Sequence, residues 1–375
     1  MKGLRGLVVT ALVVFTPVML NGAWAESPAL RTRHVIFVMT DGLRWEEVFR
    51  GADADIMDAE HGGVADVPAL KRAFWRDTVE ERRATLMPFL WTTIARHGQI
   101  FGDRDAGSDA LVTNGKNFSY PGYSETLCGF ADSRIDSNGE FFNPNVTILE
   151  WLSRRPGYQG RVAAFGAWYL FPWIINTPRA GITVNAGWEP LDTIKPTPAL
   201  SLLNRLKRES PRVWDDEPVD ALTFHTALEY MKVKKPAVLY LSLGETDVFG
   251  HARDYGNYLR AAQRADAYLR ELWETAQSMR EYRGSTTLIF SSDHGRGIGA
   301  QHWTDHGAET SGSNFIWMAF LGPDTATLGL RSRIAAVRQD QIAATLAALL
   351  GQDYQAAVPR AGAPIGDVLV HALSK

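Results

Sequence analysis

Aspartates and histidines recur at short spacings in the second half of the chain, where they could bind metal ions. Asp247 and His251 stand four residues apart in the segment DVFGH, a spacing that lets both side chains reach one ion from the start of a helix. Asp293 and His294 are adjacent, and the glycine after them permits a sharp turn, so the two side chains can point to different ions. These spacings predict a site for two divalent cations.

The segment HWTDHG is expected to supply a further imidazole. His306 is the preferred ligand because Gly307 permits a close approach, and His302 is the alternative. Carboxylate and imidazole ligands without thiolates suit zinc, and manganese and magnesium are also compatible with them. Two such ions about 4 Å apart would contact both the attacking and the departing oxygen of an in-line displacement at phosphorus.

Three predicted strands must bring these ligands together. Continuous apolar runs at 34–39, 237–243 and 286–290 are typical of strands buried on both faces of a parallel sheet. Asp41 follows the first run, Asp247 the second, and Asp293 with His294 the third. Each aspartate alone could be a helix cap or a turn residue, but caps do not account for the histidines beside them. Because ligands bind beyond the carboxyl ends of such strands, we expect one polar cluster at this edge.

The expected fold class is α/β, with a mostly parallel central sheet flanked by helices. Further strand candidates at 161–165 and 315–321 alternate with amphipathic helices at 253–279 and 339–350. Two segments, approximately 50–116 and 168–235, exceed ordinary loop lengths and are expected to form helices and a lid within one domain, 26–375. The second segment contains a group of aromatic residues, and packing within the lid is their favoured role. They could alternatively contact an apolar part of the substrate. These residues are Trp168, Tyr169, Phe171, Trp173 and Trp188.

The candidate nucleophile is Ser119, in the segment SYPGYSETLCG. This segment resembles the nucleophile segment of the alkaline phosphatase superfamily, in particular its type I phosphodiesterase/nucleotide pyrophosphatase branch, which carries Thr-Phe-Pro-Asn-His-Tyr-(Ser/Thr) and ends in glycine. Ser119 falls on the threonine of that pattern and Tyr123 on its histidine. The resemblance extends to TDG at 40–42, DVFGH at 247–251, DHG at 293–295, HG at 306–307 and the late helix with its glycine at 341–351.

The resemblance implies an alkaline phosphatase-like fold, two bound zinc ions and hydrolysis of phosphate esters through a phosphoryl-enzyme on Ser119. The implied ligands of one ion are Asp41, Ser119, Asp293 and His294, and those of the other are Asp247, His251 and His306.

Three further residues are candidate substrate contacts. Asn138, in the segment IDSN, resembles the family's Ile-x-x-Asn and would donate a hydrogen bond to a phosphoryl oxygen, and a turn role is the alternative. Arg44 could pair with a second charged group of the substrate, because guanidinium matches phosphate geometry, or could lie on the surface. Lys116 carries the same two interpretations.

Several functions are compatible with these motifs. Serine in place of the branch's threonine leaves monoester and diester substrates equally compatible. Cys128 is not followed by the Pro-x-Arg that formylglycine sulfatases need, so an ordinary sulfatase is not expected. The same metal site could instead hydrolyse phosphonates. Metal-dependent binding of phosphorylated ligands without catalysis is a further possibility, although a binding protein would not need the hydroxyl.

Composition excludes several classes of protein. The chain has 375 residues, 45% of them hydrophobic and 22% charged, which is ordinary for a globular protein. Its net charge of −3 gives no electrostatic reason to expect binding to nucleic acid or to an anionic membrane surface, so the expected partner is a small phosphorylated substrate. The single cysteine can form no intramolecular disulfide and no thiolate zinc site. Nothing in the sequence indicates the oligomeric state.

Residues 1–25 are typical of a secretory signal peptide. Lys2 and Arg5 precede an apolar run at 7–20, and the sequence Ala23-Trp24-Ala25 matches a small-x-small cleavage site. The alternative is an uncleaved anchor, but the apolar run is shorter than the roughly 20 residues of a spanning helix. We therefore expect a periplasmic or secreted bacterial protein that keeps no membrane anchor after cleavage.

Overall fold

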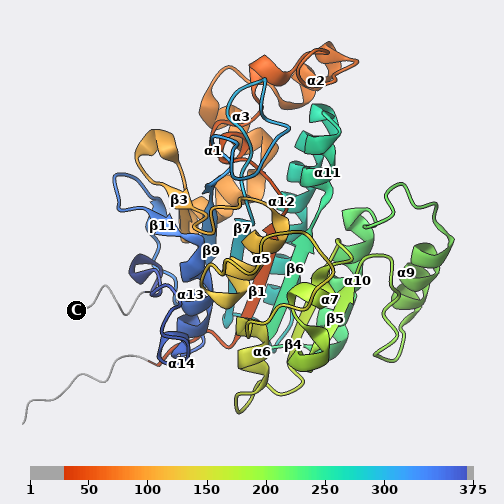
Figure 1. Ribbon diagram of the computed structural model, residues 1–375, viewed down its shortest axis with the longest axis vertical. Coiled ribbons are helices and arrows are strands. Elements are labelled where there is room, and N and C mark those ends of the chain that lie inside the picture. The colour runs from red at the N-terminus through yellow and green to blue at the C-terminus, as the bar shows by residue number, and fades with distance from the viewer. Residues whose placement is uncertain (1–28, 370–375) are drawn as a thin grey trace, which may run out of the picture.

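An eight-stranded sheet forms the centre of the computed structural model, which describes residues 29–369 (Figure 1). The strand order is β10-β2-β9-β7-β1-β6-β4-β5. Among these strands only β9 pairs antiparallel with its neighbours, so the sheet is mostly parallel, as predicted. The strands are β1 (His34–Thr40), β2 (Gln99–Phe101), β4 (Val162–Gly166), β5 (Thr183–Ala186), β6 (Val238–Leu243), β7 (Thr286–Ser292), β9 (Met318–Leu321) and β10 (Gly329–Leu330).

The run 315–321, predicted as one strand, is divided between two sheets. β8 (Phe315–Ile316) joins a small sheet with β3 (Ala110–Leu111) and β11 (Val337–Arg338), whereas β9 belongs to the central sheet. Trp317 lies between them, fully buried, and its indole N–H donates to the carbonyl of Leu43 at 3.0 Å. Trp317 is the residue at which the chain passes from one sheet to the other, and its side chain makes this buried contact.

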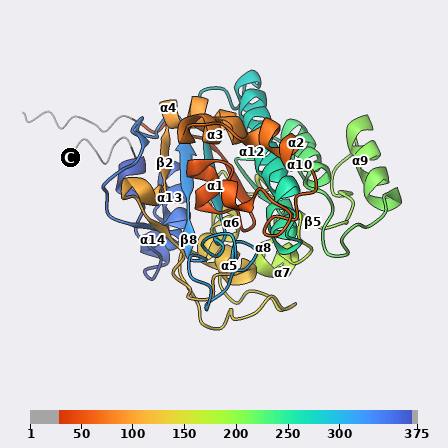
Figure 2. The same ribbon diagram turned by 90° about the horizontal axis from the view of Figure 1, so that it is seen from above.

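Helices cover both faces of the central sheet, because alternate side chains of β1 enter two separate cores. Ile36 and Val38 pack on one face, and Val35, Phe37 and Met39 on the other. The first face is covered by α1 (Trp45–Arg50), α2 (Val67–Phe74), α3 (Val79–Leu86), α9 (Pro198–Glu209), α10 (Asp220–Lys234) and α12 (Tyr255–Ser278). The second is covered by α5 (Ser119–Cys128), α6 (Ile148–Ser153), α7 (Phe171–Ile174), α8 (Thr177–Ala180), α13 (Ile342–Leu349) and α14 (Tyr354–Ala357), as Figure 2 helps to follow.

The two long segments form helices and also contribute strands. Segment 50–116 contains α2, α3, α4 (Ala95–His97) and β2, which lies in the central sheet. Segment 168–235 contains α7 to α10 and the edge strand β5. The predicted helices at 253–279 and 339–350 correspond to α12 and to α13, which is preceded by a 3₁₀ turn at Gln339–Gln341.

Among residues 29–369, no helix has both the length and the apolar character that crossing a membrane requires. The predicted signal peptide, 1–25, lies outside the described residues.

Strand register brings the polar turns together. Thr40 at the end of β1 pairs with Leu243 at the end of β6 and with Ser292 at the end of β7. Asp41 and Asp293 therefore begin their turns at the same level, and the amide of Asp41 still donates to the carbonyl of Leu243 at 2.9 Å. The helix α11 (Glu245–His251) starts two residues beyond β6 at this same edge.

Candidate active site

Four of the predicted ligands meet where β1, β6 and β7 end. Nε2 of His294 lies 3.2 Å from Oδ1 of Asp41, 3.5 Å from Oδ2 of Asp293 and 3.9 Å from Oδ1 of Asp247. Asp41, Asp293 and His294 are buried, and their ligand atoms lie close enough together to hold one ion. Two of the carboxylates come from the turns after β1 and β7 and the third from helix α11, so only the folded sheet brings them together.

A second group of ligand atoms lies beside the first, and the ligand atoms of Asp247 and His306 in it also lie close to that of His294. Nε2 of His251 is 3.2 Å from Oδ2 of Asp247 and 2.9 Å from Nε2 of His306, and Nε2 of His306 is 3.8 Å from Oδ1 of Asp247. The structure thus brings His306 into the cluster. It leaves His302 outside, with a side chain that is 68% exposed and close to Asp305.

The hydrogen bonds at these side chains fit metal binding. Oδ2 of Asp293 and Nε2 of His294 are buried without a hydrogen-bond partner, a costly arrangement that a cation would relieve. Nδ1 of His294 lies 2.8 Å from the carbonyl of Gly295, and Nδ1 of His306 lies 3.3 Å from the carbonyl of Asn117. Donation of Nδ1–H to these carbonyls leaves each Nε2 as a lone-pair donor that faces the carboxylates, as in metal-binding histidines.

The charges of the cluster call for a cation. Burial and the neighbouring carboxylate of Asp41 raise the pKa of Asp293 well above its usual range. Burial would lower the pKa of His294, but Asp293, Asp41 and Asp247 together raise it to about 9. Burial lowers the pKa of His306 to about 2, with the positive charges of His294 and Arg296 acting in the same direction. Divalent ions between these side chains would neutralise the crowded carboxylates.

Ser119 lies at the mouth of this cluster as the first residue of α5. Its Oγ is 3.4 Å from Oδ1 of Asp41, and the residue is buried. The start of a helix carries partial positive charge and unpaired N–H groups, which favour a serine alkoxide and a bound phosphoryl group. Asn117, two residues earlier, adopts a left-handed conformation with φ of 53°, which asparagine tolerates better than most residues.

Asn138 reaches the same helix end from another loop. Its side-chain oxygen accepts a hydrogen bond from the amide of Tyr120 at 2.9 Å. Because a backbone N–H can only donate, the oxygen must face α5, and the Nδ2 group is left available as a donor. Asn138 and Ser119 line one cleft of about 290 Å³.

Tyr123 has a structural link to the site that spacing alone did not indicate. It stands where the resembling family has histidine, and it is fully buried on α5. Its hydroxyl donates to Oδ2 of Asp41 at 3.0 Å and accepts from the hydroxyl of Ser242 at 2.8 Å. Tyr123 therefore orients one oxygen of Asp41 and leaves the other toward Ser119 and His294.

Arg296, which no predicted motif included, lies beneath the ligands. Its guanidinium pairs with the carboxylate of Asp247 and donates to the carbonyls of Gly42 at 3.2 Å and Thr304 at 2.6 Å. A Cβ at Gly250 would lie 2.6 Å from the guanidinium carbon. The glycine of DVFGH thus makes room for Arg296. The feature of the sequence that could have indicated Arg296 as a site residue is its position directly after the DHG motif.

The opposite wall of the cleft comes from the segment 168–235. Trp168, Trp214, Asp216 and Glu217 line it together with the ligand residues Asp41, Asp247 and His251. Burial, with Asp220 and Asp41 nearby, raises the pKa of Glu217 well above its usual range. No motif in the sequence marked Trp214, Asp216 or Glu217 as cleft residues.

Arg44 and Lys116 are not among the residues that line this cleft. Arg44 is fully buried, its guanidinium bonds to Glu47 with Nε 2.8 Å from Oε2, and it also donates to the carbonyl of Gly297 at 3.4 Å. Lys116 is half-buried in the loop before α5, where its backbone amide donates to the side chain of Asn114. Cys128 is buried at the far end of α5, beside Ser124 and Asn143.

Solved structures share this fold at low sequence identity. The lipoteichoic acid synthase LtaP from Listeria monocytogenes matches with a TM-score of 0.56 at 11% identity, over 92% of this chain and 76% of that chain. The alkaline phosphatase PafA matches with 0.54 at 10% identity, over 91% and 99%. The phosphonate monoester hydrolase SpPMH from Silicibacter pomeroyi matches with 0.54 at 14% identity, over 90% and 77%. These matches confirm the predicted alkaline phosphatase-like fold.

A search of the curated proteins finds no match. The profile of the family described as type I phosphodiesterase/nucleotide pyrophosphatase matches residues 56–306, more than half of the chain. The matched region contains Ser119 on α5, the helix α11 after β6 and the turn after β7. The chain therefore belongs to the type I phosphodiesterase/nucleotide pyrophosphatase family of the alkaline phosphatase superfamily, and it is a hydrolase of phosphoester bonds.

Proposed function

We propose that the protein is a two-cation phosphoesterase that works through a phosphoryl-enzyme on Ser119. The observation that carries this proposal is the position of the Ser119 hydroxyl, 3.4 Å from Asp41 at the start of α5 and beside two groups of metal-type ligands. One ion would be held by Asp41, Ser119, Asp293 and His294, and the other by Asp247, His251 and His306. Zinc is the metal that these ligands suit best.

The chain's own residues bind the substrate and provide the nucleophile. Ser119 Oγ forms a bond to phosphorus as the bond from phosphorus to the leaving oxygen breaks, and water later cleaves the Oγ–P bond to release phosphate or a monoester. Asn138 donates a hydrogen bond to a phosphoryl oxygen as negative charge develops there. Bound divalent cations would supply the positive charge that favours the serine alkoxide and the departing oxygen.

The test is hydrolysis of p-nitrophenyl phosphate and bis-p-nitrophenyl phosphate by zinc-loaded protein, which also ranks monoesters against diesters. Ser119→Ala is expected to lower kcat more than 100-fold, as ~3 kcal/mol of lost transition-state stabilisation would, while the metal content is retained. Ser124→Ala is the matched control, because Ser124 lies on the same helix but bonds to Asn143. Undiminished turnover in Ser119→Ala would overturn the proposal, and phosphate release from phosphonoacetate would favour the phosphonate alternative.

We further propose that the protein is exported and that residues 1–25 are removed. The support is the charged, apolar and small-x-small order of these residues. N-terminal sequencing of protein recovered from the periplasm should begin at Glu26, and an intact N-terminus in that fraction would contradict cleavage.

A further inference from the structure

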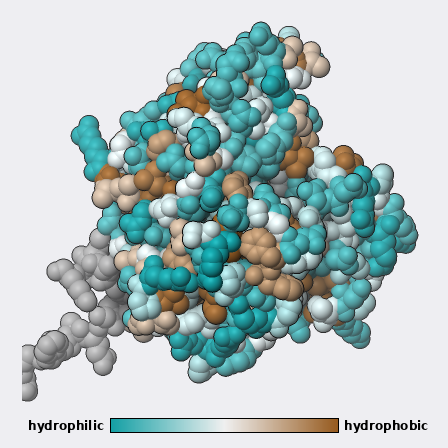
Figure 3. Space-filling model, in the orientation of Figure 1, coloured by the Kyte–Doolittle hydropathy of each residue, from teal (hydrophilic) through white to brown (hydrophobic). Residues whose placement is uncertain are grey.

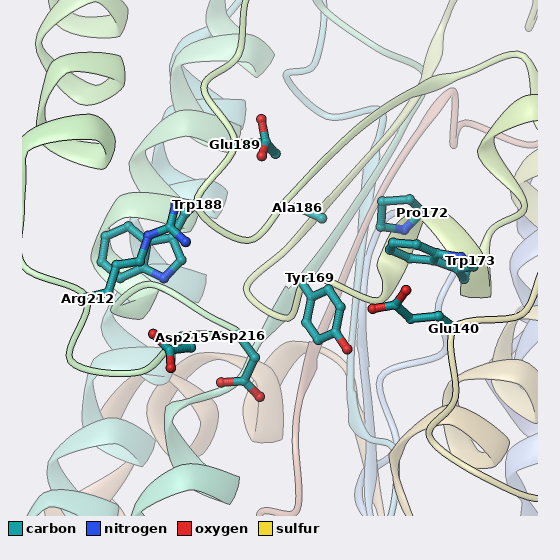
Figure 4. A pocket seen from close by; sticks show the side chains of 10 residues that line it. All are labelled: Glu140, Tyr169, Pro172, Trp173, Ala186, Trp188, Glu189, Arg212, Asp215 and Asp216. Atoms are coloured by element: carbon teal, nitrogen blue, oxygen red, sulfur yellow. The ribbon is translucent and has the colours of Figure 1, made fainter.

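A second cavity of about 540 Å³ lies next to the catalytic cleft (Figure 4). Three aromatic residues line it, Tyr169, Trp173 and Trp188. The rings of Tyr169 and Trp173 meet nearly edge to face, 6.0 Å apart at 74°, and Figure 4 shows Tyr169 between Trp173 and Trp188. Tyr169 is 36% exposed, so its ring is not fully used in packing. We call this cavity the aromatic pocket.

The aromatic pocket and the catalytic cleft share a wall. Asp216 lines both cavities, and Trp214 lines the cleft. The indole N–H of Trp188, in the pocket, donates to the carbonyl of Trp214 at 3.0 Å. Trp168 lines the cleft and its neighbour Tyr169 lines the pocket. The two cavities are therefore neighbours, and Asp216 belongs to the lining of both.

The charged residues of the pocket are mainly acidic. Glu140, Glu189, Asp215 and Asp216 line it, and Arg212 is the single basic residue among its lining residues. The guanidinium of Arg212 lies over the ring of Trp188, 5.8 Å from its centroid, so among the described residues the rings of Tyr169 and Trp173 are the ones of this pocket without a cation over them. Glu140 and Asp216 line the pocket together with Tyr169, and burial with these two carboxylates raises the pKa of the Tyr169 phenol. Aromatic faces surrounded by carboxylates attract cations and disfavour anions.

The wall that carries Trp188 is held in place from behind. The buried Nζ of Lys207 on α9 donates to Oδ1 of Asn185 at 3.0 Å and to the carbonyls of Gly187 at 3.2 Å and Glu189 at 3.0 Å. The two bonds to carbonyls fix the backbone on both sides of Trp188. The ring is therefore positioned before any ligand arrives, which lowers the entropic cost of binding.

We propose that the aromatic pocket binds the alcohol substituent of a phosphodiester substrate and selects alcohols that carry an ammonium group. This inference rests on the proposed function, since it assigns the substrate class of that same site. The rings would contact the ammonium face on, and the carboxylates would supply the opposite charge.

Two isosteric substrates test the selection. One is 2-(trimethylammonio)ethyl p-nitrophenyl phosphate, and the other is its uncharged carbon isostere, 3,3-dimethylbutyl p-nitrophenyl phosphate. We expect kcat/KM to be about tenfold higher for the ammonium diester, a factor within the range of a cation–π contact reinforced by charge. Equal values for the two substrates would overturn the inference even if both are hydrolysed.

Variants locate the selection in the pocket. In the double variant Asp215→Asn with Glu189→Gln, the ratio between the two substrates should fall to about twofold or less. Tyr169→Leu should lower the ratio in the same way, because it removes an aromatic face. Glu209→Gln is the matched control, since Glu209 is an exposed carboxylate on α9 that lines neither cavity, and its ratio should not change. An unchanged ratio in the double variant would overturn the inference.

A binding measurement separates this inference from the proposed function. Tryptophan fluorescence of Ser119→Ala protein is titrated with choline and with 3,3-dimethylbutanol, neither of which requires turnover. We expect choline to bind at least about tenfold more tightly. If bis-p-nitrophenyl phosphate is not hydrolysed but choline binds in this way, the proposed function fails and the pocket assignment stands. If the diester is hydrolysed and both alcohols bind equally, the pocket assignment fails alone.

Discussion

At the scale of single residues, the site depends on side chains that orient the predicted ligands. Tyr123 holds one oxygen of Asp41, and backbone carbonyls hold Nδ1 of His294 and His306. Such outer contacts fix the direction of each ligand atom and usually matter for metal affinity. The ligand types were readable from the sequence, but the identity of the residues that orient them was not.

Tyr123→Phe should weaken zinc binding by about 10–100-fold, because it removes the hydroxyl that orients Asp41. Competition with a chromogenic chelator measures the affinity. Tyr120→Phe is the control, since the Tyr120 hydroxyl donates to the carbonyl of Phe141 at 2.6 Å instead. Equal zinc affinities in the two variants would show that Tyr123 does not position the ligand.

At the scale of elements, the short helix α11 and the turn after β7 are joined through Arg296. The guanidinium connects Asp247 on α11 to the carbonyl of Gly42 after β1. Gly250 gives it space, because a Cβ there would lie 2.6–2.9 Å from three guanidinium atoms. Glycine in this helix has a packing role in addition to any effect on helix stability.

Gly250→Ala should lower kcat/KM for bis-p-nitrophenyl phosphate by about 100-fold, since displacing Arg296 shifts Asp247 from its position. Helix propensity alone would not predict a harmful effect, because alanine stabilises a helix by about 1 kcal/mol relative to glycine. Gly366→Ala is the control, as a Cβ at Gly366 meets nothing within 4 Å. Wild-type activity in Gly250→Ala would contradict this packing role.

At the scale of the whole molecule, the candidate metal ligands lie at the ends of three neighbouring strands in the centre of the sheet. Asp41, Asp247 and Asp293 follow β1, β6 and β7, the adjacent strands at the centre of the sheet. Without cations their charges repel one another in a buried region. On the face shown in Figure 3, hydrophobic residues are scattered in small groups among hydrophilic ones. The apolar side chains are mainly in the two cores.

Removal of metal should therefore destabilise the whole domain. Zinc at 100 times its Kd is expected to raise the free energy of unfolding by about 2.7 kcal/mol. Thermal unfolding after dialysis against EDTA should show a lower Tm, and added zinc should restore it. Asp293→Asn, which removes a ligand, should lose most of this response. A Tm that does not change with EDTA or zinc, in protein shown to have bound zinc beforehand, would contradict the prediction.

The sequence by itself determined the α/β class, the central strands and the order of the ligand motifs, because burial on both faces gives continuous apolar runs and metal ligands have few residue types. The family resemblance and the fold predicted from it were confirmed. The roles of Ser119, Asn138 and the individual ligands stay predictions that the geometry supports.

Only the tertiary structure decided which polar side chains share the cleft. His306 lies in the ligand cluster beside the cleft and His302 does not, while the guanidinium of Arg44 forms a buried ion pair with Glu47. Trp214, Asp216 and Glu217 face the ligands from a segment with no motif. Such contacts join residues far apart in the chain, and the direction of each side chain is set by packing, which local sequence patterns do not encode.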